Sequence, residues 1–178
     1  LADSLAQQDK GLSPDAAEIA GIIREQARAM HRLLSDLLDM ARLQGSSTTL
    51  RREWQPFEEV VGSSLRLVEG LAGSRPVTVN LQPDMPLMYF DAVLMERVLF
   101  NLLDNAFKYS PSGTPVAVAT TLDDATLNVS VCNEGQGFPG DRLDAMFDIF
   151  VRGHDETSIP GVGLGLAICK AIVTAHEG

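Results

Sequence analysis

The longest periodic run of apolar residues extends from Pro14 to about Leu43 and predicts one long helix. Ser13 suits the N-cap position and Pro14 suits the first helical position. A four-helix bundle formed by dimerisation would explain an apolar face this wide, although a helix packed on its own domain would show the same pattern. The residues of that face are Ile19, Ile23, Met30, Leu33, Leu34, Leu37, Leu38, Met40 and Ala41.

The composition changes at residues 44–49, which are polar and rich in Gly, Ser and Thr. Such a segment is typical of a linker or hinge. We therefore expect a helical segment over residues 1–44, a linker over residues 45–55 and a second domain over residues 56–178.

Helical and alternating patterns follow one another along the second domain. This order predicts an α+β sandwich with helices on one face of a mostly antiparallel sheet. The expected elements are a short extended segment over 50–55, a helix over 56–71, strands over 77–81 and 87–90, a helix over 91–110, strands over 116–122 and 126–132 joined by a hairpin at 123–124, a short helix over 143–147 and a final helix over 164–175.

The helix expected from Asp91 to Ser110 carries two asparagines, Asn101 and Asn105, one turn apart on the same side. Asparagine is mildly unfavourable inside a helix, because its side chain competes for backbone hydrogen bonds. Two interpretations stay open: a pair of half-exposed amides, or a site for a hard cation and a polyphosphate with Lys108 as a point charge. The expected apolar face of this helix is Val93, Leu94, Val98, Leu102 and Leu103.

Three glycines, Gly161, Gly163 and Gly165, precede the final helix and would let a phosphate approach the backbone. A Rossmann turn is rejected, because a polar loop and Pro160 stand where a strand should end. A P-loop is excluded, because no Gly-Lys-Ser/Thr follows.

A second glycine-rich loop begins with Asn133 and Glu134 at the end of an expected strand and contains Gly135 and Gly137. A side chain at that position can bind an exocyclic amine such as that of adenine, although an ordinary turn would have the same composition. Further along the chain, Phe147 and Phe150 fit a core better than a ligand surface. Arg142 and Arg152 suit either a phosphate or the protein surface.

The chain has 178 residues and a net charge of −10, which argues against nucleic acid or an anionic membrane as a partner. An anionic ligand such as ATP would therefore need Mg²⁺, a few cations and backbone N–H groups. No apolar run is long enough to span a membrane, and no signal peptide is evident. Cys132 and Cys169 lack metal-ligand spacing, so we expect both to be reduced and buried in a cytoplasmic protein.

Four segments in this order resemble the N, G1, F and G2 boxes of the histidine-kinase ATP-binding domain, which has the Bergerat (GHKL) fold. They are N-L-L-D-N-A-F-K-Y-S, N-E-G-Q-G-F-P, F-D-I-F-V-R-G and G-V-G-L-G-L-A-I-C. The upstream helix, ending L-L-S-D-L-L-D-M-A-R-L, resembles the second helix of a dimerisation and histidine-phosphotransfer domain. Wider phrases such as L-R-R-E-W-Q-P-F-E-E-V-V are similar to the potassium-responsive sensor kinases of this family.

The resemblance implies a nucleotide site in which Asn105 ligates Mg²⁺ and Asn101 lies close to the metal and the phosphates. It implies that Lys108 meets phosphate and that the glycines before the final helix hinge an ATP lid over residues 153–160. The full set of implied nucleotide-binding residues is Asn101, Asn105, Lys108, Tyr109, Asn133, Gly135, Gly137, Phe147, Phe150, Arg152, Gly161, Gly163, Leu164, Gly165 and Leu166.

The activity implied is transfer of the γ-phosphoryl group of MgATP to a histidine and onward to an aspartate of a response-regulator receiver domain. The resemblance also implies a homodimer formed through the helical bundle, and a bacterial inner-membrane kinase of which this chain is a cytoplasmic portion, in potassium or osmotic signalling. Two alternatives stay open: a non-catalytic, nucleotide-gated interaction module and a GHKL ATPase. Asn101 stands where such an ATPase needs an acidic general base, which favours phosphotransfer.

The sequence departs from the family pattern in three respects. The G1 box usually begins with Asp, and Asn133 in its place predicts adenine binding about tenfold weaker, or about 1.4 kcal/mol. The phosphoacceptor box is absent, and His31, His154 and His176 are expected to be bystanders; the acceptor is expected before Leu1. The family continues into further strands after Gly178, so we expect a truncated sheet with an unprotected edge, in a fragment that binds MgATP without autophosphorylation.

Overall fold

The structure is a computed structural model that describes residues 13–44, 50–124, 126–137, 143–151 and 163–178. The chain divides into two compact units, Leu1–Ala41 and Arg42–Gly178, and each is described by itself.

The first unit consists of the greater part of helix α2 (Pro14–Gln44), which confirms the long helix predicted from the apolar period. The predicted cap is also confirmed, because the Ser13 hydroxyl oxygen accepts a hydrogen bond of 3.3 Å from the backbone N–H of Ala16. Large apolar side chains on α2 are exposed: Ile19, Ile22, Ile23, Met30, Leu34, Leu37 and Leu38. Dimerisation through this face stays a prediction. No helix in the described part of the chain is long and apolar enough to cross a membrane.

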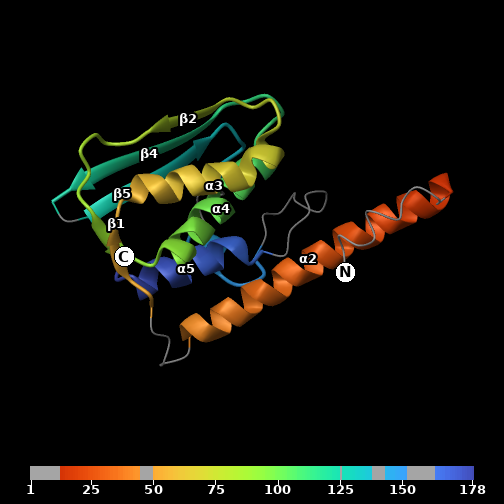
Figure 1. Cartoon of the computed structure of the whole chain (residues 1–178), viewed down its shortest axis with the longest axis horizontal. Coiled ribbons are helices and arrows are strands. Elements are labelled where there is room, and N and C mark those ends of the chain that lie inside the picture. The colour runs from red at the N-terminus through yellow and green to blue at the C-terminus, as the bar shows by residue number, and fades with distance from the viewer. Residues whose placement is uncertain (1–12, 45–49, 125, 138–142, 152–162) are drawn as a thin grey trace. The chain divides into compact units, whose positions relative to one another are not determined.

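The second unit has the predicted α+β composition, and its elements lie close to the predicted ranges (Figure 1). In chain order they are β1 (Glu53–Gln55), α3 (Phe57–Ala72), β2 (Val77–Asn80), β3 (Met88–Phe90), α4 (Ala92–Lys108), β4 (Val116–Asp123), β5 (Thr126–Asn133), the short 3₁₀ helix η2 (Asp144–Phe147) and α5 (Gly165–Ala175).

The strands form a three-stranded sheet in the order β2-β4-β5 and a separate antiparallel pair, β1-β3. Strands β4 and β5 form the predicted hairpin, and the register places Asn133 opposite Val116. Most of the strand pairing is antiparallel, as predicted, and the exception is the pair β2 and β4, which are parallel. The physical reason is the connection: β3 and the whole of α4 lie between these two strands, and such a crossover returns the chain in its original direction.

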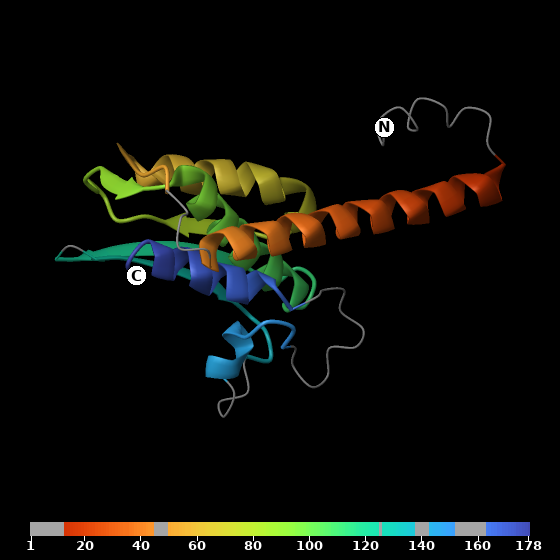
Figure 2. The same cartoon turned by 90° about the horizontal axis from the view of Figure 1, so that it is seen from below.

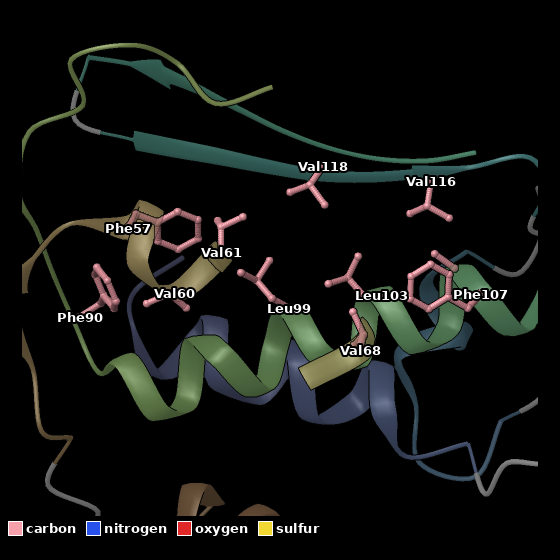
Figure 3. Close-up of a cluster of buried hydrophobic side chains, with 11 residues drawn as sticks. Phe57, Val60, Val61, Val68, Phe90, Leu99, Leu103, Phe107, Val116 and Val118 are labelled. Atoms are coloured by element: carbon pink, nitrogen blue, oxygen red, sulfur yellow. The ribbon is translucent and has the colours of Figure 1, made fainter. Parts of the chain in front are cut away.

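Helices α3 and α4 pack against one face of this sheet and enclose the main core. Figure 3 shows Val116 and Val118 of β4 facing Leu99 and Leu103 of α4, and all four side chains are at most 2% exposed. The same cluster includes Phe57, Val60, Val61 and Val68 of α3 together with Phe90, Ala106 and Phe107. Burial of this many large apolar side chains is the dominant favourable term in folding.

Helix α5 packs on α4 through a second set of buried side chains, and both helices can be followed in Figure 2. Ile168 and Ile172 of α5 are fully buried, and the Cys169 thiol donates to the backbone carbonyl of Val98 over 3.7 Å. Helix α4 therefore lies between α5 and the sheet layer, in contact with α3 as well.

One residue of the predicted apolar face of α4 is misplaced. Val93 is 77% exposed, whereas Val98, Leu99 and Leu103 are buried. At about 100° per residue, Val93 projects roughly 140° away from Val98, so both cannot face the same layer.

Candidate functional site

The asparagine helix and the glycine run predicted to act together do meet in the structure. The side-chain amide of Asn101 donates to the backbone carbonyl of Gly165 over 3.4 Å, although these residues are 64 positions apart. A Cβ on Gly165 would lie 3.7 Å from Asn101 Cγ, so the start of α5 touches the asparagine directly. The N-terminus of α5 and the polar side of α4 therefore share one location.

Asn101 and Asn105 offer hard oxygen donors at this location. Asn105 is half-buried, and its side-chain amide has no hydrogen-bond partner among the described residues. Asn101 donates through its amide nitrogen toward Gly165, so Oδ1 is the side-chain atom that can serve as a metal ligand. Amide oxygens together with nucleotide phosphates are ligands that suit Mg²⁺, so the donor set fits that ion.

Lys108, the predicted phosphate contact, is paired within its own helix. Its ammonium group lies 2.5 Å from a carboxylate oxygen of Asp104, one turn earlier. The charge at the end of α4 is thus balanced locally rather than presented as a free cation.

The glycine-rich loop after β5 packs against the C-terminal end of α4. A Cβ on Gly135 would lie 2.5 Å from the backbone oxygen of Tyr109, so only glycine fits without a shift of the backbone. The Asn133 amide donates to the Ser110 hydroxyl oxygen over 2.9 Å. Gly137 has a φ of +73° and open space around it, which is a conformation that favours glycine. Asn133 and Gly135 of the predicted G1 segment therefore lie beside Ser110 and Tyr109 respectively, just after α4.

The chain segments before and after the predicted lid are hydrogen-bonded to each other. The Phe150 backbone N–H donates to the Gly163 carbonyl over 3.0 Å, and a Cβ on Gly163 would lie 2.8 Å from the Val151 oxygen. Gly163 has a φ of +75° and Phe150 a φ of +63°, so both residues adopt the left-handed region at this junction. Arg142, Arg152, His154, Gly161 and the lid over 153–160 lie outside the described residues.

The two phenylalanines of the F segment are not in the core, which corrects the interpretation favoured from the sequence. Phe147 is 40% exposed and Phe150 is 60% exposed. Phe147 lies in η2, a single short turn that packs on α5, and Phe150 follows it outside any helix or strand. The Lys170 ammonium lies 6.0 Å from the Phe147 ring centroid, which is within reach of a cation–π contact. Leu164 is buried and Leu166 half-buried at the start of α5.

The two cysteines also differ. Cys132 on β5 is exposed, so the prediction that both thiols are buried is wrong for this one. Cys132 lies on a strand whose alternate side chains point away from the helices. Burial raises the pKa of the Cys169 thiol to about 12, because the thiolate loses its hydration, while a hydrogen bond with Asn101 and the charge of Arg97 act in the opposite direction.

Two residues that support the site, Arg75 and Ser110, were not predicted from the sequence, and only Ser110 has a sequence signal. Arg75 donates to the carbonyl of Phe107 over 2.5 Å and to that of Ser110 over 3.3 Å, and its guanidinium carbon lies 5.9 Å from the Phe107 ring centroid. It thereby satisfies carbonyls at the end of α4. Ser110 could have been anticipated, since a serine four residues after a helical carbonyl commonly bonds back to it.

His176, which was not expected to be a phosphoacceptor, has a structural role. Its Nε2 accepts a hydrogen bond of 3.1 Å from the Asp91 backbone N–H, and its Nδ1 lies 2.8 Å from the Ile172 oxygen. Asp91 is the predicted N-cap of α4, and one of its carboxylate oxygens accepts from the Leu94 N–H over 3.2 Å. The other accepts from the Arg51 N–H over 2.9 Å.

Comparison with known proteins assigns the class. The family model for histidine kinase-, DNA gyrase B- and HSP90-like ATPases matches residues 90–178, and the chain belongs to this family. The sensor protein KdpD of Escherichia coli (strain K12) is 42% identical to it over 167 residues, which cover 93% of this chain. The chain spans 18% of the length of that relative.

Solved structures agree with the fold. The mycobacterial sensor histidine kinase MprB is 30% identical, with a TM-score of 0.62 over 72% of this chain and 81% of the MprB chain. Full-length ShkA, solved in complex with AMPPNP, gives a TM-score of 0.80 over 96% of this chain and 36% of its own, at 22% identity. The resemblance to histidine-kinase ATP-binding domains and the predicted Bergerat fold are therefore confirmed.

Proposed function

We propose that this chain is the ATP-binding catalytic portion of a two-component sensor histidine kinase. The γ-phosphoryl group of ATP would pass to a histidine outside this chain and then to an aspartate on a response-regulator receiver domain. The observation that carries the proposal is that two segments meet α4 and its C-cap: Asn101 bonds to Gly165 at the start of α5, and the loop at Gly135 contacts the Tyr109 carbonyl. The similarity to KdpD and MprB supports the same assignment.

The residues at this meeting point have complementary tasks. Asn105 and Asn101 would hold Mg²⁺ through their Oδ1 atoms, and the bound ion would neutralise phosphate charge. The N-terminus of α5 would offer backbone N–H groups and a positive dipole end to the phosphates. Asn133 would accept a hydrogen bond from the adenine amine, and Lys108 would have to leave Asp104 to reach a phosphate.

The neutral amide at position 101 favours phosphotransfer over hydrolysis. A GHKL ATPase needs an acidic general base on this helix to activate water, and an amide cannot remove that proton. Transfer to a histidine needs no such base, because imidazole is itself a good nucleophile. Positioning and charge neutralisation would then supply most of the catalysis.

The similarity to KdpD extends the proposal to physiology. We place the parent protein in potassium or osmotic signalling, with a KdpE-like receiver domain as its partner and the kinase portion on the cytoplasmic side of a bacterial inner membrane. Residues 1–44 would dimerise, residues 45–55 would link, and residues 56–178 would bind the nucleotide. The exposed apolar side chains of α2 support the dimerising role.

The test is a transfer assay with [γ-³²P]ATP, a separately prepared histidine-bearing bundle domain from a KdpD-like kinase, and a receiver domain. Label is expected on the bundle domain and then on the receiver, with none on this chain alone and none with the Asn105→Ala variant. Label on this chain alone would contradict the absence of a phosphoacceptor. Phosphate release at an equal rate without the acceptor would favour an ATPase, and nucleotide binding without any transfer would favour an interaction module.

A further inference from the structure

Asn133 carries an oxygen and an NH₂ group at nearly equivalent positions, so its orientation decides whether it accepts or donates a hydrogen bond. A carboxylate at this position would accept in either orientation. The selectivity of the site for one base therefore depends on what fixes the Asn133 amide.

The end of α4 fixes it through Ser110. The last carbonyls of a helix need donors from outside the helical pattern. The Asn105 carbonyl still has its ordinary helical partner, the Tyr109 N–H at 2.9 Å, whereas the Phe107 carbonyl accepts from the Arg75 side chain over 2.5 Å. The Ala106 carbonyl, which lies between them, accepts from the Ser110 hydroxyl over 2.5 Å.

A hydroxyl group has a single proton, so Ser110 Oγ can only accept from a further partner. That partner is the Asn133 Nδ2 atom at 2.9 Å. The same nitrogen would lie 3.0 Å from a Cβ placed on Gly135, so it faces the packed side of the loop. If the amide turned over, its oxygen would face Ser110 Oγ, and either that contact would be repulsive or Ala106 would lose its donor.

The opposite atom of the amide is thereby presented outward. Asn133 is exposed, and its Oδ1 has no donor among the residues that the structure describes. Ser110 itself is 8% exposed, so water does not readily replace it as the partner of Nδ2.

We propose that Ser110 determines the base specificity of the site by locking Asn133 with its oxygen toward the nucleotide. An outward oxygen accepts a hydrogen bond from the amine at position 6 of adenine and opposes the carbonyl oxygen at the same position of hypoxanthine or guanine. The inference rests on the proposed function, in that Asn133 must face the base. Ser110 acts through Asn133 and is a positioning residue.

The probes are ADP and IDP with Mg²⁺, titrated by calorimetry, because these nucleotides differ only at position 6 and in the adjoining N1 proton. The parent chain is expected to prefer ADP by about tenfold, which corresponds to about 1.4 kcal/mol. Ser110→Ala frees the amide to turn, and the preference is expected to fall to within about threefold. Ser110→Thr keeps the hydroxyl group and is expected to keep the preference.

Two controls separate base specificity from folding. In an Asn133→Asp background the acceptor no longer depends on orientation, so Ser110→Ala is expected to leave the preference for ADP unchanged there. Ser110→Val has the shape of threonine without the hydroxyl group, and it replaces Ser110→Ala if that variant does not fold.

A readout without nucleotide comes from the Asn133 side-chain amide resonances, identified by their loss in Asn133→Asp. Their proton exchange is expected to be slowed in the parent and in Ser110→Thr, and to be fast in Ser110→Ala. An unchanged ADP preference in Ser110→Ala, or equally fast exchange in all three chains, would overturn the role of Ser110 and leave the proposed function intact. Failure of the parent to bind either nucleotide would overturn the proposed function and the specificity with it.

Discussion

The backbone N–H of Asp91 donates a hydrogen bond of 3.1 Å to Nε2 of His176, 85 residues further along the chain. Because Nε2 accepts, the ring proton must lie on Nδ1, which donates to the Ile172 carbonyl over 2.8 Å. The imidazole therefore joins the start of α4 to the end of α5. Arg52 reinforces the same place, with bonds of 2.6 Å to the Ala175 carbonyl and 3.2 Å to Glu177.

Replacing this imidazole should destabilise the second unit. His176→Ala leaves the Asp91 N–H without its acceptor, and we expect a loss of about 1–2 kcal/mol in the free energy of unfolding. The matched control is His31→Ala on α2, whose exposed imidazole should contribute less than about 0.5 kcal/mol. Urea unfolding measures both variants, and equal effects would show that the bond to Asp91 is unimportant.

The close approach of the β5 loop to α4 predicts a strong effect of one added methyl group. In Gly135→Ala the new Cβ would meet the Tyr109 oxygen at 2.5 Å, so we expect a loss of about 1–3 kcal/mol in stability and weaker MgADP binding. Gly70→Ala on α3 adds the same group with nothing within 4 Å, and should stabilise by about 0.5–1 kcal/mol. Thermal unfolding of the pair is the measurement, and a tolerated Gly135→Ala would refute the packing described.

The amide at position 133 should limit nucleotide affinity. A charge-assisted bond is worth roughly 1.5–3 kcal/mol against about 0.5–1.5 kcal/mol for a neutral one, so Asn133→Asp should bind MgADP about tenfold more tightly. Calorimetry on the two chains at one salt concentration tests this. Equal affinities would mean that this side chain does not contact the base.

The buried thiol of Cys169 predicts a loss of stability at high pH. Burial raises its pKa from 9.0 to about 12, so above pH 9 the unfolded chain binds fewer protons than the folded chain. Stability from this group is complete below pH 9 and should decline by up to about 1.4 kcal/mol per pH unit between pH 9 and 12. Denaturant unfolding across that range should show a smaller slope for Cys169→Ala than for the parent. The exposed Cys132→Ala is the control and should keep the parent slope.

The elements of the fold could be predicted from the sequence because each has a strong local signal. The apolar period of α2, the cap at Asp91 and the turn between β4 and β5 depend on residues within a few positions of one another. Strand direction has no such signal. The parallel pairing of β2 with β4 depends on how the chain crosses over through α4, which a local pattern does not encode.

The residues of the candidate site could likewise be predicted from the sequence only in part. The glycines and asparagines could be found because few residue types serve close phosphate approach and metal ligation. Partners such as Arg75 and His176 could not, because they act through contacts made only after the chain folds. Phe147 and Phe150 resemble core residues by composition, yet both are exposed, Phe147 at the end of the short η2 turn and Phe150 just after it.

The central claim is that the polar side of α4 holds a magnesium nucleotide. Calorimetry with MgADP and MgATP on the parent, on Asn105→Ala and on Asn128→Ala tests it most directly. Asn128 is an exposed asparagine of β5, so its variant controls for the loss of an amide elsewhere. We predict micromolar binding by the parent and by Asn128→Ala, and a loss of at least about tenfold, or 1.4 kcal/mol, in Asn105→Ala. Equal binding by all three chains, or no binding by the parent, would contradict the account.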